Sequence, residues 1–537
     1  MTFFAMLLLV AALGHALARA TRLPTIPILL LCGMGFAALG VVPEAALPED
    51  GQFAEAPLLR FLEFCLAFLV FASGVELTPR RFSRHRRAVA WIAAVQFLLA
   101  AAAGFGVALW MGFDLLVSCY VAAAVAASST LVGLRQLRAR RAMFEPFGRV
   151  VTGVLLVQDV VLIVVIVLMM RLAQGAGMMA AGLGALLLLA AVAFLCQQKV
   201  VPALLRRFRP DEELLLLWIV AFLFLFIGLA VYLFDLPMIA GAFFAGILFS
   251  GFPLNGLVRG QLTSLSDFFL ALFFVCLGVV VGVPGGEVLW QALGLSLVVV
   301  VVTPPVVTAV AEWRGMHTRP AVESGLLLAQ TSEFSLVLAL SGVLAGHLTA
   351  GVFQVIALTA VITMTLTPFI GTERMAHALL PLHPLRRRRP LRGELRGHVL
   401  VLGFGSAGMW VVKPLRAAGH EVVVVDDDAV VCAELMRLGI HTIRGDGSDE
   451  HTLAKVGASE AKLVICSMRR VGDALKVLEH SGEAPVLVRV LEEADARLVE
   501  RAGGTPILSA KPAAETFLQW FEKKCCTEDE KEEGESA

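Results

Sequence analysis

An aspartate stands inside a long apolar run that carries no other charge. Residues 155–165 read Leu-Leu-Val-Gln-Asp-Val-Val-Leu-Ile-Val-Val, with Gln158 directly before Asp159. An ionised side chain near the centre of a bilayer costs about 2.5–3.5 kcal/mol on insertion scales, so such acids usually face a protein interior or a water-filled cavity. There a carboxylate can bind a cation or carry a proton. A structural acid paired with a distant Arg or Lys is the alternative.

Three further polar segments belong beside Asp159. One of them, 71–77, contains Ser73 and ends the third apolar span. The other two, 126–131 and 329–335, are polar clusters that contain ligands suited to a hard cation. Hydroxyls, together with backbone carbonyls freed at an interrupted helix, bind such ions, and transporters often break helices at the membrane midplane for this purpose. The clusters occupy comparable places in the two halves of the apolar region, which favours an inverted repeat with broken helices crossing beside the aspartate. Hydrogen bonding between helices is the alternative for each cluster. The candidate residues are Ser128, Ser129, Thr130 and Glu333.

Composition predicts the kind of chain that positions these side chains. Of 537 residues 58% are hydrophobic and 16% charged, and the mean hydropathy is +0.82, which is too apolar for a soluble domain. We therefore predict a polytopic α-helical membrane domain in a lipid bilayer. Windows of about twenty apolar residues predict thirteen spans, near 2–18, 24–42, 58–77, 88–111, 113–134, 150–170, 178–198, 213–233, 236–250, 266–283, 288–311, 321–346 and 350–371.

The charges between the spans alternate. Arginines and lysines concentrate in every second loop, as in the run Arg386 to Arg389, whereas the intervening loops are acidic, with Arg171 as the main exception. By the positive-inside rule the basic loops are cytoplasmic. With an odd number of spans, the N-terminus lies outside and the C-terminus in the cytoplasm, and we expect a plasma membrane location, the inner membrane in a bacterium.

The composition after the arginine run is that of a soluble α/β domain. A buried-strand pattern at 398–402 is followed by a glycine-rich turn and a helical stretch, and further strands are predicted at 421–425, 440–443, 463–466, 486–490 and 505–508. Strands alternating with helices predict a parallel, doubly wound Rossmann-like sheet. The turn matches the dinucleotide-binding fingerprint and comprises Gly403, Phe404, Gly405, Ser406, Ala407 and Gly408.

Acidic residues follow the next strands at the spacing that a nucleotide site requires. Asp426, followed by Asp427, ends the second strand eighteen residues after Gly408, where it can accept a hydrogen bond from a ribose hydroxyl. Asp446 and Gly447 end the third strand, and we expect them near the adenine. No catalytic constellation follows, which favours a regulatory ligand, an adenine nucleotide (AMP, ADP or ATP) or NAD(H), over a hydride-transfer cofactor. A fold of this type that binds nothing is the alternative.

These patterns divide the chain into four parts. We predict a transmembrane domain at 1–375, a basic cytoplasmic linker at 376–396, a nucleotide-binding domain at 397–520 and an acidic tail at 521–537.

Five segments together resemble the Kef-type monovalent cation:proton antiporters, the glutathione-regulated potassium efflux systems and plant potassium efflux antiporters. They are FASGVELTPRRF, AASSTLVGLRQL, GRVVTGVLLVQDVVLI, LSDFFLALFFVCLGV and LLLAQTSEFSLVLA. The soluble part is similar to the TrkA N-terminal (KTN or RCK) domain that commonly follows them.

The resemblance implies a function for each module. Asp159 would alternately bind a cation, K⁺ or Na⁺, and a proton, with Gln158 in place of the first acid of two-aspartate electrogenic relatives, so that exchange is electroneutral. Ser128, Ser129 and Thr130 would help coordinate the cation. The resemblance further implies a homodimer that is regulated by nucleotide and moves like an elevator. Glutathione or an ancillary subunit is an open further partner, and no nucleic acid is expected.

One segment departs from the family pattern. Relatives often carry a basic residue in the span at 288–311, but here its centre reads Val302-Thr303-Pro304-Pro305 without any basic residue. Two prolines are expected to perturb that helix strongly. Two other classes of protein remain as alternatives: a ligand-gated potassium channel, which would need a carbonyl-lined filter such as Thr-Val-Gly-Tyr-Gly, and a membrane-anchored NAD-dependent oxidoreductase, which would need a substrate domain after 520.

Overall fold

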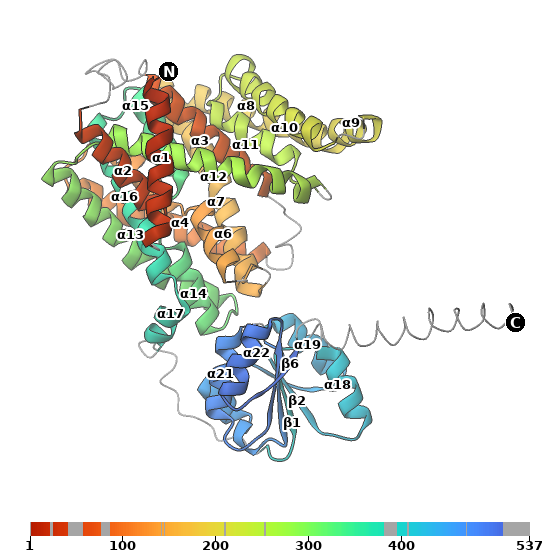
Figure 1. The fold of residues 1–537 in the computed structure, drawn as a ribbon. Coiled ribbons are helices and arrows are strands. Elements are labelled where there is room, and N and C mark those ends of the chain that lie inside the picture. The colour runs from red at the N-terminus through yellow and green to blue at the C-terminus, as the bar shows by residue number, and fades with distance from the viewer. Residues whose placement is uncertain are drawn as a thin grey trace, which may run out of the picture. The chain divides into compact units, whose positions relative to one another are not determined.

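The fold was analysed in a computed structural model of the chain. It describes residues 2–21, 25–40, 57–76, 86–140, 142–143, 145–208, 211–251, 254–380, 395–404, 408–468 and 470–508. The described residues form two compact units (Figure 1), one comprising 1–314 and 320–380 and the other 315–319 and 381–537. The domain boundaries expected from composition remain a prediction, as do those of the basic linker and the acidic tail, most of which lie outside the described residues.

The first unit is a bundle of helices. Its N-terminal half contains α1 (Thr2–Thr21), α2 (Thr25–Ala38), α3 (Pro57–Glu76), α4 (Arg86–Trp110), α5 (Leu115–Ala126), α6 (Thr130–Ala139), α7 (Pro146–Arg171) and α8 (Ala176–Leu195). Its second half contains α9 (Val201–Phe208), α10 (Glu212–Gly228), α11 (Met238–Leu248), α12 (Leu254–Val281), α13 (Gly286–Trp313), α14 (Thr318–Leu328), α15 (Glu333–Leu344), α16 (Ala350–Ile370) and α17 (Glu373–Leu379). Short 3-10 or π-helical turns, η4 (Leu172–Gln174), η5 (Cys196–Val200) and η6 (Leu229–Leu233), follow α7, α8 and α10.

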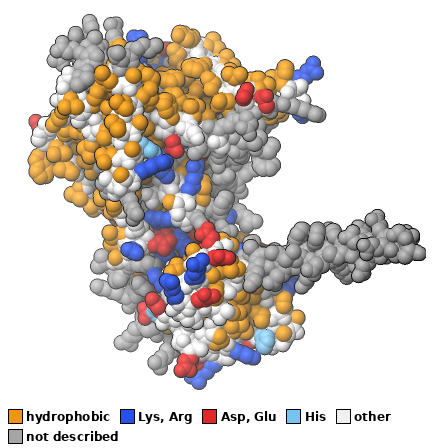
Figure 2. All heavy atoms as spheres, viewed as in Figure 1, with side chains coloured by type: hydrophobic (Ala, Val, Ile, Leu, Met, Phe, Trp, Pro, Cys, Tyr) orange, Lys and Arg blue, Asp and Glu red, His pale blue; other side chains and the backbone are white. Residues whose placement is uncertain are grey.

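All thirteen predicted spans correspond to apolar helical segments. Eleven of these segments in the described part of the chain are long and apolar enough to cross a membrane, and α2 and α11 are shorter apolar helices of 14 and 11 residues. Hydrophobic side chains cover much of the outer surface of this unit (Figure 2), as the 84% exposed Trp110 and the 71% exposed Leu187 illustrate. Such a surface fits lipid and not water.

Glycines bring two pairs of helices into close contact. A Cβ added at Gly74 on α3 would lie 2.4 Å from the carbonyl oxygen of Phe243 on α11, and one at Gly246 on α11 would lie 2.2 Å from that of Phe71. On α2 and α12, Gly33 and Gly278 repeat this arrangement, each with a backbone oxygen 2.2 Å from the added Cβ. Small residues at such crossings let helix backbones approach closely in membranes.

The second unit is a doubly wound sheet. Its strands are β1 (Val399–Leu402), β2 (Val422–Asp426), β3 (His441–Arg444), β4 (Leu463–Cys466), β5 (Val486–Val490) and β6 (Thr505–Leu508). All neighbouring strands are parallel, in the order β3-β2-β1-β4-β5-β6. The helices between them are α18 (Gly408–Ala417), α19 (Ala429–Arg437), α20 (Glu450–Lys455), α21 (Val471–His480) and α22 (Glu493–Arg501), with the 3-10 turn η9 (Ala458–Glu460) before β4.

Alternation along the central strand explains why both faces of this sheet are covered. On β1, Val399 and Val401 belong to the core beneath α18 and α19, whereas Leu400 and Leu402 belong to the core beneath α20, α21 and α22. Figure 1 shows α18 and α19 on one side of the sheet and α21 and α22 on the other. The predicted Rossmann-like fold is therefore confirmed.

Candidate functional site

Two helices of the first unit are interrupted, and their extended segments meet. The first break separates α5 from α6 at 127–129, and the second separates α14 from α15 at 329–332. A serine hydroxyl caps the helix that follows each break: Ser129 Oγ accepts from Val132 N at 3.2 Å and Ser332 Oγ accepts from Phe334 N at 3.1 Å. Such caps satisfy amides that the interrupted helix leaves free.

Hydrogen bonds between the two breaks show that they cross. Ser128 Oγ donates to the carbonyl oxygen of Leu328 at 2.7 Å, and Gln330 Nε2 donates to that of Ser129 at 3.4 Å. Nearby, Ser335 on α15 donates to the carbonyl oxygen of Ala124 on α5. Helices that are broken at the centre of a bundle expose backbone carbonyls and dipole ends to one another, which is the arrangement of ion sites in secondary transporters.

Asp159 lies beside this crossing and is fully buried. Its Oδ2 accepts from Ser73 Oγ on α3 at 2.7 Å and from Thr130 Oγ1 at the start of α6 at 2.8 Å. Among the residues that the structure describes, its Oδ1 has no hydrogen-bond partner. Within the described ranges no Lys, Arg or His forms an ion pair with it. Because a buried carboxylate without a partner charge is unfavourable, this group is suited to a cation or a proton.

Gln158 contacts backbone that the first break exposes. Its Oε1 accepts from Ser128 N at 3.0 Å, and its Nε2 donates to Gln96 Oε1 on α4, whose own Nε2 donates to the carbonyl oxygen of Ala126 at 2.9 Å. The two amides thus satisfy one N–H and one C=O that the end of α5 leaves without helical partners. Sequence reasoning did not identify Gln96, which is an isolated polar residue in an otherwise apolar span.

Glu333 is the second buried carboxylate at the crossing. Its Oε2 accepts from Ser129 Oγ at 2.6 Å, and its Oε1 has no partner. The adjacent hydroxyl groups of Ser129 and Thr130 therefore contact different acids, Glu333 and Asp159. All six predicted ion-site residues, Asp159, Gln158, Ser128, Ser129, Thr130 and Glu333, come together at this crossing.

Ser73 was not among the predicted site residues, although it contacts Asp159 directly. The signal that could have identified it is its polar cluster at the end of the third apolar span, where Ser73 precedes Gly74. Gly74 allows α3 to pack closely against α11. This close packing helps to place Ser73, the preceding residue, opposite the Asp159 carboxylate.

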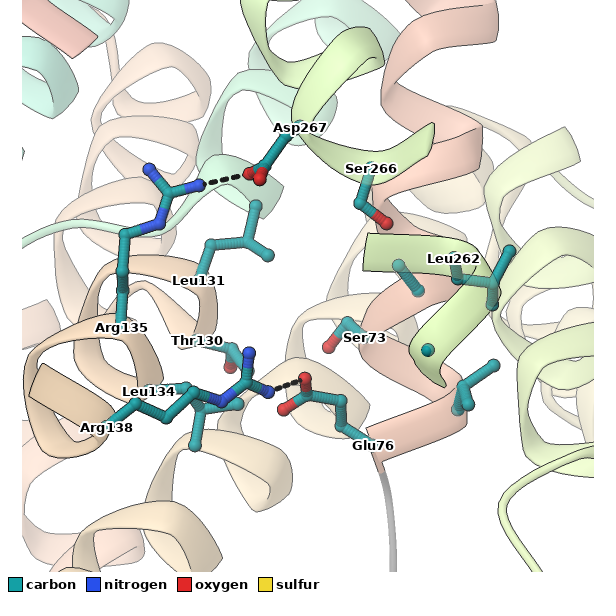
Figure 3. Close-up of a pocket in the computed structure, with 13 residues that line it drawn as sticks. Ser73, Glu76, Thr130, Leu131, Leu134, Arg135, Arg138, Leu262, Ser266 and Asp267 are labelled. Carbon is teal, nitrogen blue, oxygen red and sulfur yellow. Dashed lines mark hydrogen bonds and ion pairs between the residues drawn. The ribbon is translucent and has the colours of Figure 1, made fainter. Parts of the chain in front are cut away.

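A cavity of about 520 Å³ reaches this site. Ser73 and Thr130, the two donors to Asp159, line its inner part, and two ion pairs lie at its rim (Figure 3). Arg138 on α6 pairs with Glu76 at the end of α3. One turn earlier on α6, Arg135 Nη2 lies 2.6 Å from Asp267 Oδ1 on α12. The cavity therefore gives water and ions a route to the residues that hold Asp159.

The span with two prolines is not interrupted, contrary to the sequence-based expectation. Helix α13 is continuous from Gly286 to Trp313 with Pro304 and Pro305 inside it. In a packed membrane bundle neighbouring helices and local adjustments accommodate the missing N–H groups. Gly325 on α14 provides the space here, since a Cβ at this position would lie 2.6 Å from the carbonyl oxygen of Pro304.

Arg171, the exception to the charge pattern, has a structural role at the end of α7. Its guanidinium donates to the carbonyl oxygen of Asp235 at 2.5 Å and pairs with Asp235 Oδ2 at 3.0 Å. Asp235 has a left-handed backbone with a φ of 50°. The interaction anchors the end of the helix that carries Asp159.

The second unit places the predicted nucleotide-site residues at one edge of its sheet. Gly403, with a φ of 77°, follows β1 and adopts the left-handed conformation that favours glycine. Asp426 ends β2, where its carboxylate accepts from Phe404 N at 2.7 Å and from Asp428 N at 2.8 Å. Gly408 begins α18, and the Phe404 ring leaves no room for a side chain at this position. Gly405, Ser406 and Ala407 lie outside the described residues.

The residues after β3 lie at the same edge. Asp446 Oδ1 accepts from both the backbone N and the Oγ of Ser448, at 2.9 and 2.8 Å. Gly447 leaves little room for a side chain, because an added Cβ would lie 3.2 Å from Met468 Sδ. Asp427 is half-buried beside Asp426. The ends of β1, β2 and β3 thus form the crevice at which doubly wound sheets bind ligands.

A multi-pass helical bundle with two broken helices crossing beside a buried carboxylate is the architecture of a secondary transporter. The chain belongs to the sodium/hydrogen exchanger family, whose transmembrane domain matches residues 5–372. A TrkA-N domain matches residues 399–510. The protein is therefore a multi-pass cation:proton antiporter with a C-terminal TrkA-N (RCK) domain.

Solved structures resemble each part. The sodium/proton antiporter MjNhaP1 from Methanocaldococcus jannaschii is 14% identical, with a TM-score of 0.51 over 71% of this chain and 99% of its own. This likeness supports the fold. The TrkA-N domain of the inner membrane protein ybaL from Escherichia coli is 18% identical, with a TM-score of 0.23 over 24% of this chain and 99% of its own. The NAD(P)-binding domain of an exopolyphosphatase-related protein from Archaeoglobus fulgidus is 24% identical, with a TM-score of 0.23 over the same shares.

Proposed function

We propose that the protein exchanges K⁺ or Na⁺ for H⁺ without net charge movement, and that it serves potassium efflux coupled to proton uptake as in Kef-type antiporters. The observation that carries this proposal is the environment of Asp159. This buried carboxylate has no ion pair within the described residues, one unpartnered oxygen and two hydroxyl neighbours. An ionised carboxylate in this environment binds a monovalent cation, and the protonated acid releases it.

Oxygen atoms around Asp159 provide the further ligands. The hydroxyls of Ser73 and Thr130, which donate to Asp159, retain lone pairs that face the same region and can coordinate a cation. Ser128 and Ser129 keep the carbonyls of the break in place, and Gln158 holds the backbone N–H of Ser128. In this scheme Gln158 positions the loop and carries no charge. One titratable group at the centre of the site gives one-for-one exchange.

Glu333 has a different role in the proposal. It holds Ser129 from the opposite break, so a change in its protonation alters the hydrogen bonding of a residue next to the ligand Thr130. Its unpartnered Oε1 makes it a secondary cation ligand. Alternating access requires one group of helices to move against another. In this proposal α5, α6, α7, α14 and α15 move as one body, and α3, α11 and α12 stay in place. The movement carries Asp159 away from Ser73 and from the cavity.

Exchange in proteoliposomes tests this proposal. With a pH-sensitive dye inside, K⁺ or Na⁺ added outside an acid-loaded vesicle should cause proton efflux whose rate does not change when a lipophilic ion sets the membrane potential. Because proton and cation compete for one carboxylate, the apparent KM for the cation should increase as pH falls, while the maximal rate changes little. A rate that follows the imposed potential would contradict one-for-one exchange. Cation flux without proton movement would indicate a channel.

We further propose that the TrkA-N domain binds a regulatory adenine nucleotide (AMP, ADP or ATP) or NAD(H). The left-handed Gly403 makes the tight turn after β1 that leads to α18, and the N-terminus of this helix would stabilise the charge of a phosphate. The Asp426 carboxylate at the end of β2 would accept from a ribose hydroxyl, and Asp427, Asp446 and Gly447 line the adjacent edge. We also propose a homodimer regulated from the cytoplasm, on the basis of the family resemblance, and an inner-membrane location with the N-terminus outside, on the basis of the alternating charge of the loops.

Asp426→Ala should abolish stabilisation by nucleotide. A ligand at 100 times its Kd stabilises a protein by about 2.7 kcal/mol, so NAD⁺ or ADP, tested separately, should raise the melting temperature of the wild type but not of this variant. Asp428→Ala is the matched control, since Asp428 caps α19 through Val430 N at 2.8 Å. The control should melt earlier yet keep its shift. An unaltered shift in Asp426→Ala would place the ribose contact elsewhere.

A further inference from the structure

A second cavity, of about 370 Å³, lies between helices of the membrane unit. It lies among the start of α2, the second half of α6, the middle of α12 and the end of α16. Its polar lining residues are Thr25, Arg135 and Gln136, and its apolar lining residues include Leu270, Met364 and Phe369. None of these groups takes part in the proposed ion site, which lies behind Arg135 in the neighbouring cavity.

The depth of this cavity matches that of lipid headgroups. Thr25 is the first residue of α2, Arg135 and Gln136 lie in the last two turns of α6, and Pro368 lies in the last turn of α16. Phe369 on the same turn is 53% exposed. Helix ends that carry arginine lie at the interface between hydrocarbon and water on the cytoplasmic side. The polar lining residues of the cavity therefore lie at headgroup level, and its apolar wall extends along the helices toward the hydrocarbon.

We propose that this cavity binds an anionic phospholipid, whose phosphate pairs with Arg135 and one of whose acyl chains lies against Leu270, Met364 and Phe369. A guanidinium is the preferred partner of a phosphate because its fixed fork can donate two parallel hydrogen bonds. The Gln136 amide and the Thr25 hydroxyl add neutral donors. The loops at this side are basic and predicted to be cytoplasmic, where anionic lipids concentrate, and basic pockets between transmembrane helices bind their headgroups.

The present partner of Arg135 can be exchanged for a lipid. The side chains of Arg135 and Asp267 are 52% and 55% exposed, and water screens such a pair so that it contributes little to stability. Arg135 lines both cavities, whereas Asp267 lines only the one that reaches Ser73 and Thr130. A phosphate in the second cavity thus competes with Asp267 for the same guanidinium.

This competition predicts opposite effects for the two members of one ion pair. Full-length protein in an uncharged detergent is titrated with dioleoyl phosphatidylglycerol or dioleoyl phosphatidylcholine, and bound lipid is counted by native mass spectrometry. Wild type should bind phosphatidylglycerol at least tenfold more tightly. Arg135→Gln should lose this preference, and Asp267→Asn, which frees Arg135, should strengthen it. If the pair were only structural, both variants would change lipid binding in the same direction, and that result would overturn the proposal.

Three controls separate the lipid from its charge. Arg138→Gln removes an equal charge from the same helix but from a residue that lines only the first cavity, so it should keep the preference. If this variant also loses it, general attraction of anionic lipid explains the binding and the site is wrong. Glycerol 3-phosphate should not displace the lipid, and dihexanoyl phosphatidylglycerol should bind more weakly than the dioleoyl form. Displacement by the free phosphate, or equal affinity of the two lipids, would exclude the acyl chain from the cavity.

Discussion

Asp159→Asn should reduce cation/proton exchange to the level of protein-free liposomes. Asparagine has nearly the same shape and can still accept from Ser73 and Thr130, so the hydrogen bonds at 2.7 and 2.8 Å can persist. What the substitution removes is the negative charge that binds the cation and the group that carries the proton. Folding should be preserved, because the buried carboxylate contributes no ion pair within the described residues. The measurement is dye-reported exchange in proteoliposomes at saturating K⁺ and at saturating Na⁺.

The matched control lies on the same helix. Thr152→Val also removes a buried polar group from α7, but this hydroxyl contacts only the carbonyl oxygen of Gly148, one turn earlier, at 2.7 Å. The control should exchange at a rate close to that of wild type. If Asp159→Asn matched it, the transported ion would bind elsewhere, and Glu333, the other buried carboxylate at the crossing, would be the next candidate.

The ion site was largely predictable because polar and charged residues within apolar spans are easy to recognise in the sequence. A carboxylate such as Asp159 or a hydroxyl cluster such as Ser128 to Thr130 is rare within an apolar span, since each costs free energy unless a partner is present. The sequence could not show which groups meet across more than two hundred residues, as Ser129 and Glu333 do. The sequence placed the segment 71–77 beside Asp159, but it could not show that Ser73 donates to the carboxylate, because this contact depends on how closely two helices approach.

The fold was predictable to different degrees in its two units. Hydrophobic length identified all thirteen apolar segments, but it overestimated the shorter helices α2 and α11, and it could not predict that α13 accommodates Pro304 and Pro305. Helix propensity gives the free-energy cost of a proline in an isolated helix. Whether α13 stays continuous in the protein also depends on the space that Gly325 leaves beside Pro304. In the second unit the apolar strands and the glycine-rich turn were sufficient to predict a parallel sheet, because a strand buried on both faces has few other arrangements.

Close helix packing also connects stability to the ion site. Helix α3 carries Ser73 toward Asp159 and Glu76 toward the rim of the first cavity, and α12 carries Asp267 there. The glycine contacts of α3 with α11 and of α2 with α12 therefore help to position Ser73, Glu76 and Asp267 opposite the broken helices. A change at these contacts is expected to affect both folding and the geometry at Asp159.

Gly246→Val should cause a large loss of stability. Its Cβ would lie 2.2 Å from the carbonyl oxygen of Phe71 and 2.9 Å from the Cα of Gly74, and both are backbone atoms that cannot rotate away. Overpacking of a core by side chains costs about 1–3 kcal/mol, and separating two helix backbones should exceed that range. The expected result is loss of the monodisperse peak in detergent size-exclusion chromatography, or a strongly lowered melting temperature.

Gly184→Val tests whether the effect arises from the contact and not from glycine itself. Gly184 lies within α8, and a Cβ there meets no other atom within 4 Å, so this variant should retain the elution profile and melting temperature of wild type. Both substitutions replace a helical glycine by the same β-branched residue. The change in helix propensity is therefore the same in the two variants and does not contribute to the difference between them. If Gly246→Val is also tolerated, α3 and α11 are not held by this contact, and the placement of Ser73 beside Asp159 needs another cause. If it folds but exchanges slowly, α3 has moved with Ser73, which is the result that a positioning role for this crossing requires.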